Sequence, residues 1–334
     1  MTRSSEFTYT PAWWVPGAHL QTLWGKLLPC APEVPTRIER WHTPDDDEIE
    51  VRRLDPHPKI ADSTPRLIIL HGLEGTIRSH YLQRTLAQAR ARGWAADVLL
   101  FRGCNGEVNR ARRFYHSGET TDIDFVVRRI VAEHPGCSIG MVGYSLGGNV
   151  LLKWLGEQGE HLPAQVRAAA AVSVPFDLER SSRRLEQGLS RVYARRFLRT
   201  LRLKALAKLE RFPGLFDAHR LAGARTLFDF DDVVTAPVHG FASASDYYRR
   251  SSSQQYLVSI RRPTLLLSAY DDPFLPPEVL NDVAILALHN TFLSAEFYRR
   301  GGHVGFISGI NPFHSHHFAE ERVLDFLAGE IKTG

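Results

Sequence analysis

Short apolar segments rich in β-forming residues recur along this chain, and amphipathic helical segments lie between most of them. This alternation is typical of a mainly parallel sheet that carries helices on both faces. Eight strands are expected, at Arg37–His42, Ile49–Leu54, Leu67–Leu70, Ala96–Phe101, Ile139–Gly143, Ala169–Val174, Thr264–Ala269 and Thr291–Tyr298. Helices are expected at Tyr81–Arg92, Thr120–Glu133, Asn149–Gln158 and His317–Ile331. The sequence therefore predicts an α/β fold, with a mostly parallel eight-stranded sheet flanked by helices.

The alternation of strands and helices is interrupted over residues 176–261, and this stretch contains a basic segment. Arg180–Arg211 contains eleven lysine and arginine residues against two glutamates, a local net charge of +9, whereas the whole chain carries +4. Apolar residues recur there every three to five positions, which predicts amphipathic helices. We expect residues 176–261 to form a basic helical cap or lid over the carboxyl edge of the sheet, where α/β folds bind ligands. The core then comprises residues 37–175 and 262–334, and residues 1–36 form an aromatic extension packed on it.

A serine flanked by glycines follows the strand predicted at Ile139–Gly143. The segment Gly143-Tyr144-Ser145-Leu146-Gly147 has the G-x-S-x-G pattern, and a helical segment comes directly after it. In this strand–turn–helix setting the sharp turn leaves little room for side chains, and it holds the serine hydroxyl clear of the sheet. Ser145 is therefore the predicted nucleophile. The alternative is a tight turn in which the serine only caps the helix.

A second turn upstream is suited to binding an oxyanion. His71-Gly72-Leu73-Glu74-Gly75 follows the strand Leu67–Leu70, and a His-Gly pair at this place supplies one backbone donor of an oxyanion hole. The predicted donors are the amides of Leu73 and Leu146. We expect His71 to have a structural role and not to act as the base. The possible pocket residues are His71, Gly72, Tyr144, Cys104 and His116.

The predicted acid and base lie in two later loops, in the order nucleophile, acid, histidine. The strand at Thr264–Ala269 is followed by Asp271 and Asp272, and the last strand by Gly301-Gly302-His303. Glycines on both sides of His303, at 301, 302 and 305, leave its loop free to enter the site, so His303 is the predicted base. For the acid that orients the base we favour Asp272 over Asp271, because Asp272 lies one step further past the strand, where the chain bends.

With these residues the chain resembles the α/β-hydrolase fold superfamily, and in particular the YheT-like hydrolases and the mammalian ABHD1/ABHD3-type group. The resemblance covers nearly the whole chain. It rests on PAWW at 11–14, HLQTL at 19–23, HGLEG at 71–75, FRGCNGE at 101–107, YHSGET at 115–120, GYSLGGN at 143–149, DDP at 271–273 and GGHVGF at 301–306. It implies a serine hydrolase of carboxylic esters, either a short-chain carboxylesterase or an enzyme like monoacylglycerol lipase.

We expect no cofactor and no metal, since the sequence has no P-loop and no dinucleotide-binding fingerprint. The expected partner is a small-molecule ester, without nucleic acid, and the basic segment suggests peripheral contact with an anionic membrane. One alternative is a thioesterase or amidase that uses the same triad. Another is a non-catalytic, hydrolase-like scaffold that binds anionic surfaces. The sequence predicts neither the acyl chain length nor the oligomeric state.

The expected location is the cytoplasm. The three cysteines at 30, 104 and 137 include no C-x-x-C motif, so a reducing compartment is favoured over a disulfide framework. No apolar run approaches the ~18 residues of a membrane-spanning helix. The first residues also lack the apolar segment of a signal peptide, and we expect no counterpart of the membrane anchor that the mammalian relatives carry.

Overall fold

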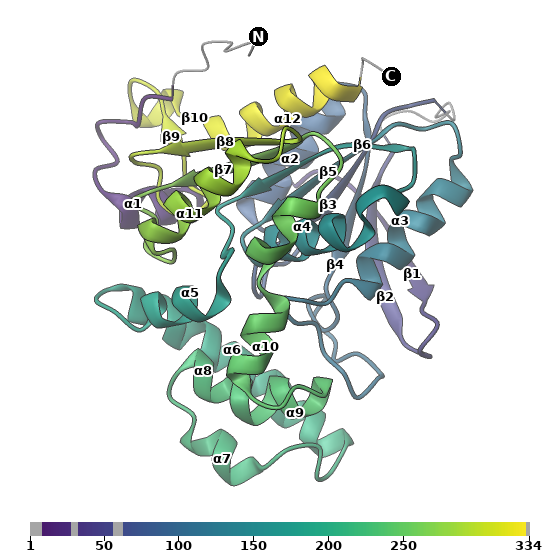
Figure 1. Ribbon diagram of the computed structural model, residues 1–334, viewed down its shortest axis with the longest axis vertical. Helices are drawn as coiled ribbons and strands as arrows, with labels where there is room; N and C mark the ends of the chain where they lie inside the picture. The colour runs from purple at the N-terminus through teal and green to yellow at the C-terminus, as the bar shows by residue number, and fades with distance from the viewer. Residues whose placement is uncertain (1–8, 28–32, 56–62, 332–334) are drawn as a thin grey trace.

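The computed structural model describes residues 9–27, 33–55 and 63–331, and its centre is a sheet of eight strands (Figure 1). The strands are β1 (Arg37–His42), β2 (Glu48–Leu54), β3 (Arg66–Leu70), β4 (Ala95–Leu100), β5 (Ile139–Tyr144), β6 (Val166–Val172), β7 (Thr264–Ala269) and β8 (Leu293–Tyr298). Across the sheet they follow the order β1-β2-β4-β3-β5-β6-β7-β8. Strands β3 to β8 run parallel, whereas the pairs β1–β2 and β2–β4 are antiparallel. The predicted mostly parallel sheet is confirmed.

The largest deviation from the predicted strands concerns β6. This strand begins at Val166, three residues before the predicted start, because Val166 pairs with Ile139 across a register shift. It also ends at Val172, before the predicted Val174, because Ser173 turns the chain with a φ of 52°. An apolar run marks the middle of a buried strand well, but it does not mark the residue at which pairing stops.

Helices cover both faces of the sheet. On one face α3 (Thr121–Glu133), α4 (Leu146–Gln158) and α11 (Pro277–Leu288) share a buried apolar cluster with the strands. On the other face α2 (His80–Ala91) and α12 (Phe318–Ile331) share a second cluster. Strand residues alternate between the two clusters, as the pleat of a sheet covered on both sides requires. Helix α12 begins one residue later than predicted, because His317 pairs with Ile307 in a small hairpin of β9 (Ile307–Ser308) and β10 (His316–His317).

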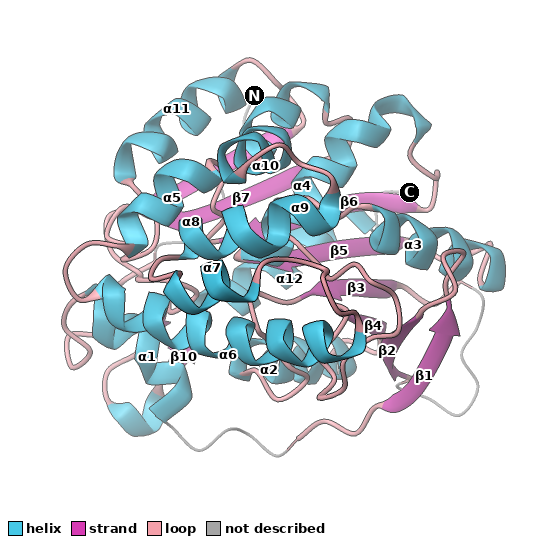
Figure 2. Cartoon of the chain, turned by 90° about the horizontal axis from the view of Figure 1, so that it is seen from below, coloured by secondary structure: helices cyan, strands magenta, loops and turns pink. Residues whose placement is uncertain are grey.

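All the described elements between residues 178 and 259 are helical, and they gather beyond one end of the sheet (Figures 1 and 2). They are α5 (Leu178–Leu185), α6 (Ser190–Arg211), α7 (Ala218–Gly223), α8 (Leu227–Phe230), η2 (Asp231–Thr235), α9 (Ala236–His239), α10 (Ala244–Ser251) and η3 (Ser253–Ser259). Several of them enclose an apolar cluster of their own around Leu198 and Phe230. We propose that residues 176–261 act as a cap, with residues 37–175 and 262–334 as the core.

The described part of the N-terminal segment packs on the loop that follows β8. Ala12 N donates to Ile307 O over 2.9 Å, and Ile307 N donates to Gln21 Oε1 over 2.7 Å. Gln21 belongs to α1 (Ala18–Leu27). Residues 1–8 and 28–32, which include Cys30, lie outside the described residues. The segment 9–27 is therefore joined by hydrogen bonds to a loop almost three hundred residues away in sequence.

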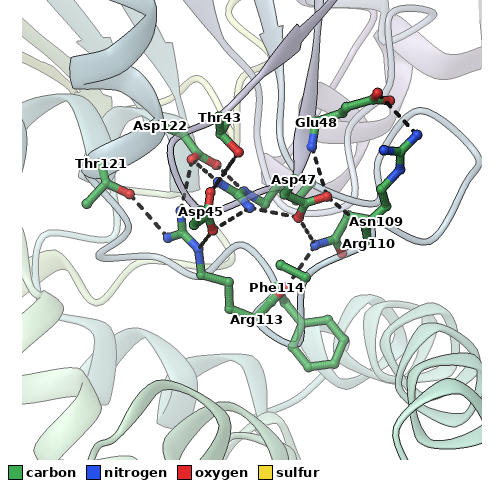
Figure 3. Close-up of polar contacts among 12 residues, drawn as sticks. Thr43, Asp45, Asp47, Glu48, Asn109, Arg110, Arg113, Phe114, Thr121 and Asp122 are labelled. Carbon is green, nitrogen blue, oxygen red and sulfur yellow. Dashed lines mark hydrogen bonds and ion pairs between the residues drawn. The ribbon is translucent and has the colours of Figure 1, made fainter.

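A buried polar network fixes the long loop between β4 and α3 (Figure 3). Arg102 has a fully buried side chain and contacts Asp122 through two nitrogens, at 2.8 and 2.7 Å. It also contacts Asp47, at 2.7 Å, and Asp45, at 2.9 Å, in the turn between β1 and β2. Bidentate arginine–carboxylate pairs of this kind fix geometry as well as charge. The network therefore ties the start of the loop to the edge of the sheet.

We expect Arg102→Met to lower the free energy of unfolding by about 3–5 kcal/mol, because it leaves buried carboxylates without their countercharge. Urea denaturation monitored by circular dichroism would measure the loss. Arg112→Met, at an exposed position of the same loop, is the matched control and should change stability by about 0.5 kcal/mol or less. Equal stability of the two variants would contradict a stabilising role for the network.

Candidate active site

Ser145 lies in a strained turn between β5 and α4. Its φ of 52° is in the left-handed region, which few residues other than glycine adopt. A Cβ atom at Gly143 would lie 2.5 Å from Gly147 O, and one at Gly147 would lie 2.4 Å from His71 O. No larger residue can occupy either place without a shift of the backbone. The two glycines thus permit the sharp turn that the G-x-S-x-G pattern predicts.

A continuous chain of hydrogen bonds joins Ser145, His303 and Asp272. Ser145 Oγ lies 2.9 Å from His303 Nε2, and His303 Nδ1 lies 2.8 Å from Asp272 Oδ2. Asp272 is buried, and its second oxygen accepts a hydrogen bond from Phe274 N over 2.8 Å. The carboxylate can therefore hold the imidazole with Nε2 free to accept a proton from the serine. The structure brings together the three residues predicted as nucleophile, base and acid.

The neighbouring carboxylate, Asp271, has a different partner. Its Oδ1 accepts a hydrogen bond from Gly302 N over 2.9 Å, so it holds the backbone of the histidine loop and does not touch the imidazole. Burial raises the pKa of Asp271. Of the two candidate acids, only Asp272 contacts the His303 imidazole within the described residues.

The loop that follows β3 runs beside the serine. A Cβ at Gly72 would lie 3.2 Å from the Cβ of Ser145, and Gly72 N donates to the hydroxyl of Tyr81 over 2.9 Å. Leu146 is the first residue of α4, where backbone N–H groups have no partner inside the helix. Among the hydrogen bonds of the described residues, neither Leu73 N nor Leu146 N is a donor. Both amides therefore remain available to bind an oxyanion.

A cavity of about 1210 Å³ opens above the serine, between the core and the cap. Gly72, Cys104 and His116 line it, as expected for pocket residues. Cys104 is buried, and burial raises its pKa to about 11, so the thiol is not poised as a nucleophile. The side chain of His116 is largely buried, and this burial, followed by its neighbour His239, lowers its pKa well below the usual value.

The other two expected pocket residues, His71 and Tyr144, do not line the cavity. His71 is fully buried, with Nδ1 2.7 Å from Gly72 O and Nε2 3.1 Å from Phe101 N, and burial lowers its pKa to about 4. The Tyr144 hydroxyl lies 2.7 Å from Thr85 Oγ1. Both side chains support the turns from behind, because residues at the end of a strand alternate between its two faces.

Three positioning residues were absent from the sequence prediction. Thr22 Oγ1 accepts a hydrogen bond from His303 N over 2.9 Å, and Ser173 Oγ accepts one from Val304 N over 3.0 Å. The ring of Phe274 stacks on the imidazole, with centroids 4.1 Å apart. Phe274 follows the DDP motif directly, so its proximity was a readable signal. Thr22 and Ser173 gave none, because their contacts cross long stretches of sequence.

A cap residue also reaches the loop beside the serine. Lys204 Nζ of α6 lies 2.7 Å from Glu74 Oε1, and Glu74 is the residue after the predicted donor Leu73. Glu74 has a φ of 54°, and both its carboxylate and its backbone N–H bond to the hydroxyl of Tyr115, over 2.7 and 3.0 Å. Helix α6 and the loop that follows β3 are thus joined by an ion pair in which Glu74 is largely buried.

Comparison with known proteins identifies relatives over most of the chain. A profile of the alpha/beta hydrolase fold matches residues 65–309. The chain is 39% identical over 332 residues to “Putative esterase YheT” of Escherichia coli, and the match covers 99% of this chain and 96% of that protein. It is 30% identical over 311 residues to “Phospholipase ABHD3” of Mus musculus, with coverages of 91% and 74%. It is 31% identical over 260 residues to “Monoacylglycerol lipase” of Saccharomyces cerevisiae, with coverages of 75% and 57%.

Solved structures share the architecture at lower identity. The esterase Pf2001 of Pyrococcus furiosus superposes with a TM-score of 0.57 at 17% identity, covering 89% of this chain and 91% of that one. An acylaminoacyl peptidase of Pyrococcus horikoshii gives a TM-score of 0.58 at 17% identity, covering 92% and 42%. At such identity these likenesses concern the fold alone. Within the described residues, no helix has the length and hydrophobicity to cross a bilayer.

The contrast between the two aspartates predicts unequal effects on the reactivity of Ser145. Asp272→Asn should slow covalent labelling of Ser145 by a fluorophosphonate about 10³-fold or more, because an amide cannot stabilise the imidazolium of His303. Asp271→Asn removes a carboxylate of the same loop and should slow it less than about tenfold. Mass spectrometry of the labelled peptide gives the rates. The reverse ranking would assign the acid to Asp271.

Proposed function

This chain belongs to the α/β-hydrolase family, and we propose that Ser145, His303 and Asp272 are its catalytic triad and cleave carboxylic esters through a covalent acyl-enzyme. Relatives named as an esterase, a phospholipase and a monoacylglycerol lipase make the chain an ester hydrolase. The observation that carries the proposal is the unbroken hydrogen-bonded chain from Ser145 Oγ through the imidazole to Asp272, at the floor of a large cavity.

The contacts suit an acyl-transfer mechanism. Ser145 Oγ attacks the ester carbonyl carbon while His303 Nε2 accepts its proton, and Asp272 stabilises the imidazolium that forms. The amides of Leu73 and Leu146 donate to the oxygen that becomes negatively charged. His303 then protonates the departing alcohol, and water attacks the acyl-enzyme in the same way. The strained elbow holds Oγ in place before the substrate arrives, so less order is lost in the reaction.

The lining of the cavity is consistent with an ester that has a sizeable apolar acyl chain. Most cap residues on that wall are apolar, among them Leu178, Leu185, Phe197, Leu201, Leu227 and Phe230. Such a wall favours a lipid-like ester, as in a monoacylglycerol lipase, over acetate esters alone. A thioesterase or amidase would use the same triad, whereas a non-catalytic scaffold would not need the three residues in contact. Turnover of p-nitrophenyl esters from C2 to C16, beside matched thioesters and anilides, would separate these functions.

Replacing triad members should give losses that do not add. Ser145→Ala and His303→Ala should each lower ester turnover on the order of 10⁴-fold or more, and the double variant should be hardly worse than either, because the two residues act as a unit. The measurement is kcat/KM for a short p-nitrophenyl ester, with circular dichroism as the check on folding. A fully active Ser145→Ala protein, or additive losses, would contradict the mechanism.

We further propose that the outer face of α6 meets an anionic membrane surface. Apolar side chains on and just before this helix are 46–66% exposed: Leu189, Val192, Leu203 and Leu206. Four arginines lie among them, namely Arg191, Arg195, Arg196 and Arg199, and within the described residues none of their guanidinium groups has a hydrogen bond or ion pair. Other cap arginines, such as Arg180 and Arg220, do pair with aspartates.

This outer face is continuous with the cavity. Leu189, Val192 and Arg196 line the cavity as well as the surface, and so do Lys26 and Leu27 of α1. A lipid could therefore pass from a membrane to the serine without crossing water. Arginine head groups attract anionic lipid while their stems and the leucines enter the interface. The cytoplasmic location stays a prediction from the cysteine content, and the described cysteines, Cys104 and Cys137, are buried.

Binding to vesicles tests this surface. Arg195→Glu/Arg199→Glu should weaken binding to anionic vesicles at low salt about tenfold or more, because each basic residue near such a surface contributes roughly 1 kcal/mol. Turnover of a soluble short ester should be unchanged. Arg90→Glu/Arg299→Glu, which makes the same charge change at exposed positions elsewhere, is the matched control. Equal affinity for neutral and anionic vesicles, or none for either, would remove the proposal.

A further inference from the structure

We infer that the cap carries a polar subsite that binds a hydrogen-bond-donating group of the substrate, a hydroxyl or an ammonium. This inference rests on the proposed function, since it concerns the ester that reaches Ser145. The subsite consists of five residues that line the same cavity as Ser145: Ser181, Ser182, Asp231, Thr235 and Tyr248. They come from three cap segments, α5, η2 and α10, so the folding of the cap brings them together.

Asp231 is the centre of the subsite. Its Oδ1 accepts a hydrogen bond from Thr235 Oγ1 over 2.6 Å, and its Oδ2 accepts one from the Tyr248 hydroxyl over 2.7 Å. Among the ion pairs of the described residues, none involves Asp231, although its neighbours Asp229 and Asp232 both face arginines. Burial raises the pKa of its carboxyl to about 6. An ionised carboxylate has about four acceptor sites, so two hydroxyl donors leave room for a ligand donor.

Ser181 supplies a second, independent observation. It is 5% exposed, and its hydroxyl has no hydrogen-bond partner within the described residues. The adjacent Ser182 lies close by, with its Oγ 3.3 Å from the Tyr248 hydroxyl. Buried hydroxyls are nearly always hydrogen-bonded, and leaving one unpaired costs stability. An unpaired hydroxyl on a cavity wall is explained if a ligand group completes its bonding.

The charge of the subsite selects the ligand chemistry. The surrounding wall is apolar, with Leu178, Leu185, Leu227 and Val234 beside these polar residues. A carboxylate in such surroundings repels anionic groups and accepts hydrogen bonds only, so the ligand must donate. A glycerol hydroxyl, a primary ammonium, or a hydroxyl on the acyl chain all meet this requirement. A plain alkyl ester does not, and it would leave Asp231 and Ser181 without a ligand partner.

The test compares kcat/KM of the full chain for esters of one acyl chain length. The probes are the ethyl ester, the glycerol ester, the 2-aminoethyl ester, and an ethyl ester with a terminal hydroxyl on the acyl chain. Wild type should prefer at least one donor-bearing ester over the plain ethyl ester. Asp231→Asn should lower kcat/KM for that ester about tenfold or more, and Ser181→Ala should lower it several-fold, because a bond to a charged acceptor is the stronger one. Turnover of the plain ethyl ester should be kept in both variants.

Matched controls separate a subsite from a structural effect. Asp232→Asn changes the neighbouring aspartate, which pairs with Arg220 and does not line the cavity. Ser253→Ala removes another buried, unpaired hydroxyl that is also off the cavity. Neither control should change the preference among the esters.

The outcomes also distinguish the subsite from the proposed function. The ester whose kcat/KM falls most in Asp231→Asn shows whether the subsite binds an alcohol hydroxyl, an ammonium or an acyl hydroxyl. Equal losses for all four esters, or no loss for any, would overturn the subsite while Ser145 still hydrolyses the ethyl ester. Failure of wild type to hydrolyse any of the esters would instead contradict the proposed function.

Discussion

The close approach of backbone segments at the carboxyl end of the sheet is the constraint on which the site depends. The turn at Ser145 packs tightly on the loop after β3. A Cβ atom at Gly147 would lie only 2.4 Å from His71 O, and one at Gly72 would lie 3.2 Å from the Cβ of Ser145. This contact places the proposed nucleophile, Ser145, beside the two amides proposed to bind the oxyanion. Because the backbone of parallel strands sets the spacing, the chemistry needs few further side chains.

The basic helix α6 divides its charges between two roles. Lys204 and Lys208, one helical turn apart, reach toward the core, where Lys204 pairs with Glu74 and Lys208 donates to Asn109 O over 2.7 Å. The unpaired arginines lie on the opposite face of the same helix. Lysine suits the inward face, since its compact ammonium can bond backbone carbonyls at the end of a flexible stem. The basic residues of α6 therefore form two separate surfaces.

The sequence predicts the strands well and singles out the three residues of the proposed triad, because those signals are local. Apolar runs and a glycine-flanked serine can be read within ten residues, and His303 stands out by its glycines. Thr22, Lys204 and Asp231 have no such local signal. Each was identified only by its contact with a residue of another element, namely His303, Glu74 and Tyr248 respectively. The sequence also did not show that the side chains of His71 and Tyr144 point away from the cavity. The face on which a side chain lies depends on the residue at which the strand ends, and a shift of one residue reverses it.

The division between core and cap explains how such a chain can keep its chemistry while its selectivity changes. Every group proposed to handle the proton or the oxyanion comes from the core, where β-strands fix its place. The groups proposed to choose the substrate, around Asp231, and to meet a lipid surface, on α6, belong to the cap. Contacts such as Lys204 with Glu74, Ser190 Oγ with Pro273 O and Ser117 N with the Tyr247 hydroxyl join the two. Substitutions on the cavity wall of the cap that leave these contacts in place can therefore alter which ester is bound at little cost to the proposed triad.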